Sequence, residues 1–333
     1  MSVNFSRNFS FAFILSLPCA YAMESDEIKN ARAKADVTQY ASTKKLETRI
    51  DANCFDAKVD PYVVSGKRLL DLLTEEGIVK PHGLEIGAGT GLFANLNLSA
   101  LKEHNATLHC TDNSDAMVET LGKNLQSQNP RLALDPTVVT NYSKADAAKL
   151  SFSSSEPFDF AVAYSMVYEI RGKGEQTAAD ARNIAFGKLS EVVKDGCLMG
   201  FFTFNYEKQF KEVYDLVGEA AAKFGIEILN NNIRKAIAGF CSDGFGDDLP
   251  ARQQLAQHFD VVEEHFYPSE IFWDIPKVVS YWNSLAVAQS FGLSNNAEFN
   301  QVLADSVKQH LEEKGTDKLR VSKEQGASLL YRM

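Results

Sequence analysis

The sequence predicts an α/β protein with a doubly wound, mostly parallel sheet and helices on both faces. Strand-like and helix-like segments alternate from about residue 64 onward, which is typical of parallel sheets because each parallel pair needs a crossover connection. Residues 197–204 are a continuous apolar run, as expected for a strand that is covered on both faces. A glycine-rich loop directly follows the first strand, residues 84–86, and the rest of the sheet is organised around it.

The glycine-rich loop has glycine at every second position, at Gly87, Gly89 and Gly91. Glycine tolerates a positive φ and lets a ligand approach the backbone closely, so a loop of this kind between a strand and a helix presents N–H groups to a bound molecule. A dinucleotide-binding fold requires G-x-G-x-x-G, whereas here Leu92 stands where that third glycine belongs. The spacing therefore disfavours a nicotinamide-dependent oxidoreductase.

With Glu85 before the glycines, the segment E-x-G-x-G-x-G resembles motif I of the class I S-adenosylmethionine-dependent methyltransferases. In that family the loop crosses under the methionine half of the cofactor. The resemblance implies S-adenosyl-L-methionine as cofactor and contacts from Glu85, Gly87, Ala88, Gly89 and Gly91. A glycine-rich turn without a ligand is the alternative interpretation.

A second group of expected cofactor contacts follows the strand at residues 106–111, which leads into Asp112. An acid at this point of a doubly wound fold accepts hydrogen bonds from ribose hydroxyls. Asp112, Asn113 and Met117 also resemble the family's D-x-S-x-x-M segment, in which the methionine flanks the adenine ring. The alternative for Asp112 is an N-cap of the next helix.

The third strand is expected at residues 137–142, and Asp146 and Ala147 follow it. The resemblance implies that the Asp146 carboxylate accepts from the adenine amine and that the Ala147 N–H donates to a ring nitrogen. A helix cap is again the alternative, and it is compatible with adenine binding.

The fourth strand, residues 158–164, is where family members differ in substrate chemistry. The chain has neither the N/D-P-P-Y/F tetrad of amino-directed nucleic-acid methyltransferases nor the Pro-Cys of cytosine-C5 enzymes. Tyr164 is expected among the cofactor contacts. Tyr168 and Glu169 are the candidate catalytic residues, because they could orient or deprotonate an acceptor. Packing for the tyrosine and a surface position for the acid are the alternatives.

The resemblance extends to the C-terminus. A sixth strand is expected near residues 259–266, and residues 326–331 resemble the family's antiparallel seventh strand. We therefore expect a seven-stranded sheet in a methyltransferase domain at residues 76–333. Helical insertions at about 206–257 and 276–315 are expected to form a cap. Residues 23–75 are expected to be an N-terminal helical segment, in which Tyr40 and Tyr62 serve either as a lid or as packing for a helix.

Residues 1–22 resemble a secretory signal peptide, with an apolar run at residues 11–17 and an A-x-A cleavage site at residues 20–22. The run is too short to span a bilayer, so we expect no membrane span in the mature chain. Because S-adenosylmethionine is made in the cytosol, a start of translation at Met23 and a cytoplasmic protein form the second interpretation. Export and cytoplasmic location both remain open.

The composition narrows the class of partner. A net charge of −10 argues against a nucleic-acid surface, which needs clustered basic residues. The five cysteines lack metal-ligand spacing, so we expect no metal site. The sequence thus predicts methyl transfer to a small molecule of unidentified structure. The alternatives are a protein methyltransferase and an exported, effector-like protein that uses the fold for binding. The oligomeric state is not predicted.

Overall fold

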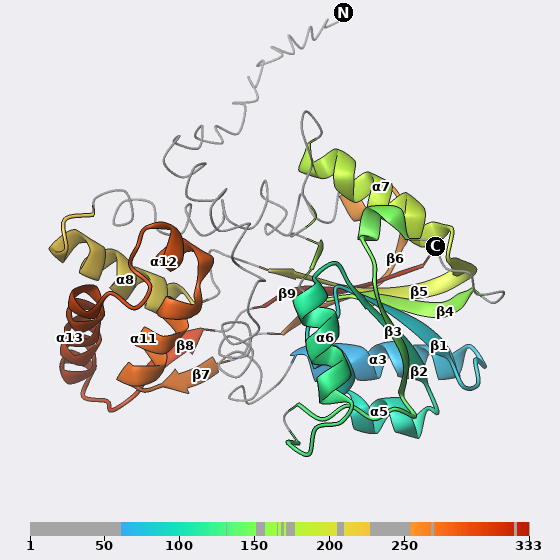
Figure 1. The fold of residues 1–333 in the computed structure, drawn as a ribbon, viewed down its shortest axis with the longest axis horizontal. Helices are drawn as coiled ribbons and strands as arrows, with labels where there is room; N and C mark the ends of the chain where they lie inside the picture. Colours follow the sequence, from blue (N-terminus) through green and yellow to red (C-terminus); the bar gives the residue numbers. More distant parts are fainter. Residues whose placement is uncertain are drawn as a thin grey trace, which may run out of the picture.

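The computed structural model contains two bodies, a sheet body and a helical body (Figure 1). It describes residues 61–130, 132–150, 157–164, 166, 167, 170, 177–204, 210–226, 254–267, 270–322 and 325–332. The signal-like residues 1–22, the segment 23–60 with Tyr40, and Tyr168 and Glu169 lie outside these ranges. No helix in the described ranges is both long and apolar enough to cross a membrane.

The sheet body contains a seven-stranded sheet in the order β3-β2-β1-β4-β5-β9-β6. Its strands are β1 His82–Ile86, β2 Thr107–Asp112, β3 Val139–Lys144, β4 Phe158–Ala163, β5 Val193–Phe204, β6 Asp260–Tyr267 and β9 Gln325–Arg332. Strands β1 to β5 pair in parallel, and β9 is antiparallel to both β5 and β6. The order reverses at β1, whose neighbours are β2 and β4, so β1 is central and all but its first residue are buried. The predicted doubly wound parallel sheet is confirmed.

Helices and one 3₁₀ turn connect these strands and cover the sheet (Figure 1). They are α3 Pro61–Glu75, α4 Leu92–Leu96, α5 Leu98–Glu103, α6 Asp115–Asn124, the 3₁₀ turn η2 Ala147–Lys149, and α7 Ala178–Ser190. Helix α7 shows how local sequence sets a boundary. The Thr177 side chain accepts from the Asp180 N–H at 3.1 Å, and the Asp180 carboxylate accepts from the Thr177 N–H at 3.2 Å. This capping box satisfies two backbone donors.

The segment after the glycine loop forms two helices, because buried Asn97 separates α4 from α5. The Asn97 side-chain amide donates to the Phe93 carbonyl at 3.0 Å and to the Tyr62 carbonyl at 3.2 Å. It packs so closely on α3 that a Cβ at Gly66 would lie 2.3 Å from the Asn97 Oδ1. Asn97 therefore joins α3 to the helices after the glycine loop, at the expense of one continuous helix.

Helix α3 packs into the core of the sheet body. Its residues Leu69, Leu70 and Leu73 are fully buried, and Tyr62 is 6% exposed. The Tyr62 ring meets the Tyr164 ring edge to face at a centroid distance of 5.7 Å. Tyr62 thus packs a helix, and the lid interpretation is wrong for this residue.

The helical body has a hydrophobic core of its own, centred on Trp273, Trp282 and Phe299. It consists of α8 Lys211–Lys223, β7 Glu270–Trp273, α11 Ile275–Ser284, α12 Ala286–Ser290, α13 Ala297–Lys314 and β8 Leu319–Ser322. Three of its helices, α11, α12 and α13, fall within residues 275–314. The antiparallel pair β7–β8 is an addition that the sequence analysis lacked.

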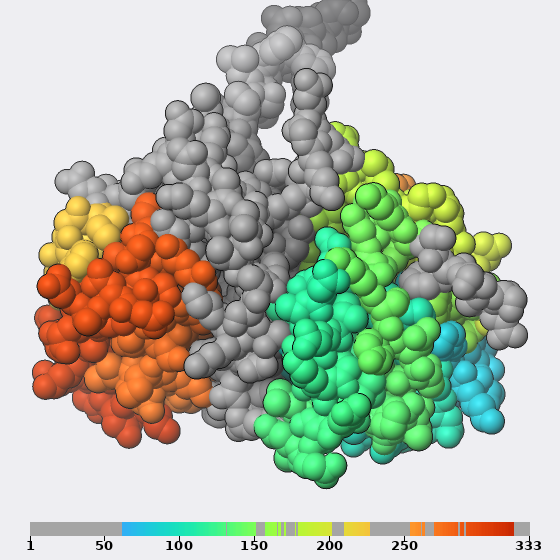
Figure 2. All heavy atoms as spheres, in the orientation of Figure 1, coloured from blue at the N-terminus to red at the C-terminus, as the bar shows by residue number. Residues whose placement is uncertain are grey.

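Strands β6 and β9 lead directly into β7 and β8, which places the helical body relative to the sheet. Tyr267 pairs with Gln325 at the end of the main sheet, and Glu270 pairs with Ser322 at the start of the smaller one. Gln325 also pairs with Phe204 at the carboxyl end of β5. The helical body therefore lies beyond the carboxyl edge of the parallel strands, where Figures 1 and 2 show it in yellow and orange.

Candidate functional site

The site at the carboxyl edge begins with the loop between β1 and α4. Gly87, Gly89 and Gly91 have φ angles of 68°, 57° and 91°, in the left-handed region that favours glycine. The Ala88 N–H donates to the Thr111 carbonyl at 2.8 Å, and the Gly91 N–H donates to the Ala88 carbonyl at 2.9 Å. The loop is thus tied both to the end of β2 and to itself.

Two of the three glycines also make room for neighbouring side chains. A Cβ at Gly87 would lie 2.5 Å from the Met166 Cβ, and a Cβ at Gly91 would lie 2.7 Å from the Leu134 Cδ1. Both distances are far below a van der Waals contact. Met166 and Leu134 were not predicted from the sequence. The glycine motif does not indicate which distant side chain packs beside each glycine.

Asp112 joins the loop to β2. Its Oδ2 accepts from the Gly89 N–H at 2.9 Å, and its Oδ1 accepts from the Ser114 N–H at 2.8 Å. Burial raises the pKa of the Asp112 carboxyl, and the backbone donors oppose that shift. The N-cap of α6 is Ser114, whose hydroxyl accepts from the Met117 N–H at 3.4 Å. The alternative that Asp112 caps this helix is therefore wrong.

The end of β3 lies beside Asp112. The Ala145 N–H donates to the Asp112 carbonyl at 2.9 Å, which brings Asp146 and Ala147 to the same edge. The Asp146 carboxylate accepts from the Ala148 N–H at 3.0 Å and caps η2, as the alternative interpretation foresaw. Ala147 is 8% exposed, and among the described residues no acceptor for its N–H is found. A helix cap and a ligand contact are compatible here.

Glu85 lies in β1 two residues before Gly87, and its side chain is on the same side of the sheet as that of Cys110, its partner in the register of β1 and β2. Glu85 is 4% exposed, and its Oε2 accepts from the Cys110 Sγ–H at 3.3 Å. Burial raises the pKa of Glu85 to about 8, the hydrogen bond from Cys110 lowers it, and the charge of Asp112 raises it further. Burial also raises the pKa of the Cys110 thiol. The carboxyl group is therefore largely neutral at pH 7.

Two supporting side chains complete the loop, and neither was expected. The Thr111 hydroxyl donates to the Glu85 carbonyl at 2.9 Å, and the buried Asn124 amide donates to the Thr90 carbonyl at 2.8 Å. Asn124 comes from α6, so the helix after β2 also holds the glycine loop. The register of β1 with β2 would have drawn attention to Cys110 and Thr111, but Asn124 has no signal in the sequence.

The remaining predicted cofactor residues separate into two groups. Asn113 is exposed and Met117 is 1% exposed, both next to Asp112 in the chain. The structure does not bring Tyr164 to this group. Its hydroxyl lies 2.5 Å from the Ser65 Oγ on α3, and its ring packs edge to face against Phe93 at 5.1 Å. These contacts give Tyr164 a place in the core, because the side chain at the end of β4 faces α3 and α4.

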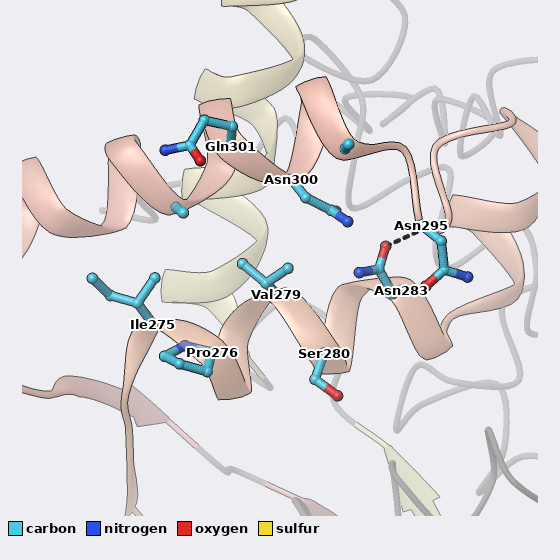
Figure 3. Close-up of a pocket in the computed structure, with 10 residues that line it drawn as sticks. Ile275, Pro276, Val279, Ser280, Asn283, Asn295, Asn300 and Gln301 are labelled. Atoms are coloured by element: carbon cyan, nitrogen blue, oxygen red, sulfur yellow. Dashed lines mark hydrogen bonds between the residues drawn. The ribbon is translucent and has the colours of Figure 1, made fainter.

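A separate cavity of about 530 Å³ lies in the helical body, between α11 and α13 (Figure 3). Its polar lining consists of Ser280 and the side-chain amides of Asn283, Asn295, Asn300 and Gln301. The Asn283 Oδ1 accepts from the Asn295 N–H at 2.8 Å, so part of this lining braces the turn before α13. No predicted cofactor residue lines the cavity. Within the described ranges, no three His, Cys, Asp or Glu residues gather to hold a metal ion.

Comparison with known proteins agrees with the motif. Residues 84–201 match the methyltransferase domain family. No curated protein sequence matches the chain. Among solved structures, the chain is similar to an S-adenosylmethionine-dependent methyltransferase from Clostridium acetobutylicum, with 18% identity, 52% of this chain and 63% of that chain covered, and a TM-score of 0.37.

Two further solved structures cover more of the chain. The first is phosphoethanolamine N-methyltransferase 2 of Haemonchus contortus in complex with S-adenosyl-L-methionine, with 14% identity, 91% of this chain and 59% of that chain covered, and a TM-score of 0.44. The second is the [4+2]-cyclase SpnF, with 14% identity, 91% of this chain and 96% of that chain covered, and a TM-score of 0.43.

Proposed function

We propose that the chain methylates a small molecule. The premise is the methyltransferase domain at residues 84–201, which makes the chain an S-adenosylmethionine-dependent methyltransferase. The observation that carries the proposal is the group of backbone and carboxyl groups at the carboxyl edge of β1, β2 and β3. There Asp112 accepts from Gly89 and, through its carbonyl, from Ala145. Asp112 thus links the ends of β1, β2 and β3 through its side chain and its main-chain carbonyl.

The residues of the loop fit the methionine end of the cofactor. We assign that end to Glu85, Gly87, Ala88, Gly89 and Gly91. The positive φ angles hold the loop in a shape that other residues adopt only with strain. When bound, S-adenosylmethionine supplies a methyl group on a sulfonium, which is already a good leaving group.

The residues after β2 and β3 fit the adenosine end. The Asp112 carboxylate already accepts from the Gly89 and Ser114 N–H groups, and its two oxygens retain acceptor capacity for a ribose hydroxyl. The Asp146 carboxylate and the Ala147 N–H supply an acceptor and a donor for the adenine edge. Met117 and Asn113 follow Asp112 and are assigned to the adenine site with them. We do not assign Tyr164 to the cofactor site, because its side chain packs against Ser65 and Phe93 in the core.

The acceptor is assigned to the small-molecule class on three grounds. The chain carries a net charge of −10, which disfavours nucleic acid. Its fourth-strand segment has neither of the nucleic-acid signatures. The helical body lies beyond the carboxyl edge, where it would enclose a small acceptor and exclude water.

Whether the reaction needs a general base depends on whether the acceptor group carries a proton that it must lose. A carboxylate acceptor is already ionised, and alignment with the methyl group is then sufficient. A phenol or an amine would lose its proton to Tyr168 or Glu169, which we propose as the catalytic residues after β4. Tyr168→Phe and Glu169→Gln test this role by the pH dependence of kcat, because removal of a base removes its ionisation from the profile.

The cofactor assignment is tested by calorimetric titration of the full chain with S-adenosylmethionine, S-adenosylhomocysteine and NADH. We expect the first two to bind and NADH to leave the heat unchanged. If a folded chain binds NADH and neither of the others, the methyltransferase function is excluded.

The acceptor class is tested separately with S-adenosylmethionine that carries a radioactive methyl group. The full chain is incubated with this cofactor and with separate small-molecule, protein and RNA fractions of a cell extract. We expect label in the small-molecule fraction, and chromatography then isolates the acceptor. Label in the protein fraction alone would establish protein methylation in place of our proposal.

A further inference from the structure

Glu85 is a buried carboxyl group without a cationic partner in the described part of the chain. Within the described residues its side-chain donor is the Cys110 Sγ–H, at 3.3 Å. The thiol is a weak donor. The other ionisable group that acts on Glu85 is Asp112, which is negative when ionised. On the opposite neighbour, β4, the residue in register with Glu85 is Val162, which is apolar.

Burial and a like charge both favour the neutral form of this carboxyl group. A carboxylate transferred from water to the interior loses its hydration, and one thiol replaces little of it. Consistent with this geometry, the pKa of Glu85 is about 8, because burial outweighs the hydrogen bond from Cys110. Near pH 7 the Glu85 carboxyl group is thus largely protonated, two residues before the first glycine of the loop.

Glu85 also lies next in sequence to the loop that we assign to the charged, sulfonium end of the cofactor. It precedes Gly87 by two residues, its main-chain carbonyl accepts from the Thr111 hydroxyl, and the Thr111 carbonyl accepts from the Ala88 N–H, so Thr111 ties Glu85 to the loop. The proposed function assigns this loop to the methionine end, which carries the sulfonium. The product, S-adenosylhomocysteine, has a neutral sulfur at the same position. An adjacent positive charge stabilises a carboxylate and a neutral sulfur does not.

We propose that Glu85 recognises the sulfonium charge by losing its proton when S-adenosylmethionine binds, so that preference for the cofactor over its product increases with pH. The proton passes from the carboxyl group to solvent, and no covalent bond between heavy atoms changes. Glu85 is thus a specificity-determining residue that limits inhibition by the product. This inference rests on the proposed function.

The experiment is calorimetric titration of the full chain at pH 7 in phosphate and in Tris, whose protonation enthalpies differ. The difference in heat counts the protons released on binding. We expect S-adenosylmethionine to release a large fraction of one proton and S-adenosylhomocysteine to release much less. Between pH 6 and pH 8 the affinity for S-adenosylmethionine should rise by up to about tenfold per pH unit, the limit for one linked proton.

Two variants and one control identify the group. Glu85→Gln should abolish both the proton release and the pH dependence. Cys110→Ser replaces a weak donor by a stronger one, so the pH-dependent range should move to lower pH. Glu103→Gln, an exposed acid on α5, removes the same charge and should behave as the wild type.

The inference is overturned if the wild type binds S-adenosylmethionine without proton release, if S-adenosylhomocysteine releases as many protons, or if Glu85→Gln retains the release. Should Glu85→Gln fail to fold, an unshifted pH range in Cys110→Ser overturns it. Failure of both ligands to bind the folded wild type at any pH would instead refute the proposed function.

Discussion

The sheet body and the helical body differ in how their cores are built and in what their buried polar groups do. The core of the sheet body packs Phe93, Phe158, Phe160 and Phe201 around parallel strands. At the glycine loop its buried Glu85, Thr111 and Asn124 side chains are hydrogen-bonded. The helical body instead packs around two tryptophans. The glycine loop and the carboxyl groups of the candidate site thus belong to the sheet body.

The helical body retains buried polar atoms that the described residues leave without a hydrogen bond. These are the indole Nε1 atoms of Trp273 and Trp282 and the Oδ1 of Asn300, and the sheet body retains such an atom too, the Oδ1 of Asn97. An unpaired buried donor costs free energy, and in the helical body the two indoles lie at the centre of the core, where their apolar contacts offset that cost. The two bodies should therefore respond differently to mutation.

The largest effect is expected from Trp282→Ala. Trp282 is fully buried and packs on Phe299 at a ring distance of 5.8 Å, and its removal should lower the free energy of unfolding by about 3–5 kcal/mol. Scanning calorimetry should show the loss in the helical body, while titration with S-adenosylmethionine shows affinity retained in the sheet body. Phe272→Ala is the matched control, because Phe272 is 44% exposed. A single transition that also abolishes cofactor binding would mean that the two cores unfold as one.

The next effect is the pH dependence of stability in the sheet body. The pKa of Glu85 is about 8 in the folded chain and 4.5 in the unfolded chain. The stability contributed by its neutral form is therefore complete below pH 4.5 and is lost as the pH rises toward 8, by at most about 1.4 kcal/mol per pH unit. Urea unfolding from pH 5 to pH 8 should show this slope in the wild type and in Glu103→Gln. Glu85→Gln should lack it, and an unchanged slope would show that another group titrates.

A smaller effect is expected from Asp112→Ala, measured as cofactor affinity. Loss of the carboxylate removes an acceptor from the Gly89 N–H and from the proposed ribose contacts, which should weaken S-adenosylmethionine binding by about 1–3 kcal/mol. Asp115→Ala is the control, because its carboxylate is 82% exposed on the neighbouring helix. Wild-type affinity in a folded Asp112→Ala chain would remove this residue from the site.

The smallest effect is expected from Arg68→Ala, which breaks a contact between α3 and β6. The Arg68 Nε donates to the Glu263 Oε2 at 2.9 Å, but the two side chains are 32% and 25% exposed. Solvent screening limits the loss of stability to about 1 kcal/mol or less. Urea unfolding at low salt and at high salt should show the difference shrink with salt. A loss of several kcal/mol would mean that the packing of α3 had collapsed.

The sequence alone was sufficient for most of the sheet body. The predicted strands at residues 106–111 and 137–142 are observed as Thr107–Asp112 and Val139–Lys144, and the C-terminal strand is observed as Gln325–Arg332. Apolar runs between turn signals locate such strands because both faces of a parallel sheet are buried. The glycine spacing located the loop, because few residues other than glycine adopt the φ angles that it needs.

Other features depend on partners that are distant in the chain. Asn97 divides a helix because the carbonyl of Tyr62 accepts its amide, and Tyr164 lies in the core because Ser65 and Phe93 face it. None of these three partners is near in the sequence to the residue that it contacts, so no local pattern contains the information. The pair β7–β8 was missed for the same reason, since each strand is short and its partner follows three helices.

The sequence by itself thus determined the parallel sheet and the position of the loop, because local glycine spacing and strand periodicity encode them. Tertiary structure decided the protonation of Glu85, since only the packing of β1 against β2 buries that carboxyl group beside a thiol and away from any described cation. It also decided the position of the helical body, because the continuous register of β6–β9 and β7–β8 carries that body beyond the carboxyl edge. Burial and strand register arise from contacts between distant residues, and they exist only once the chain has folded.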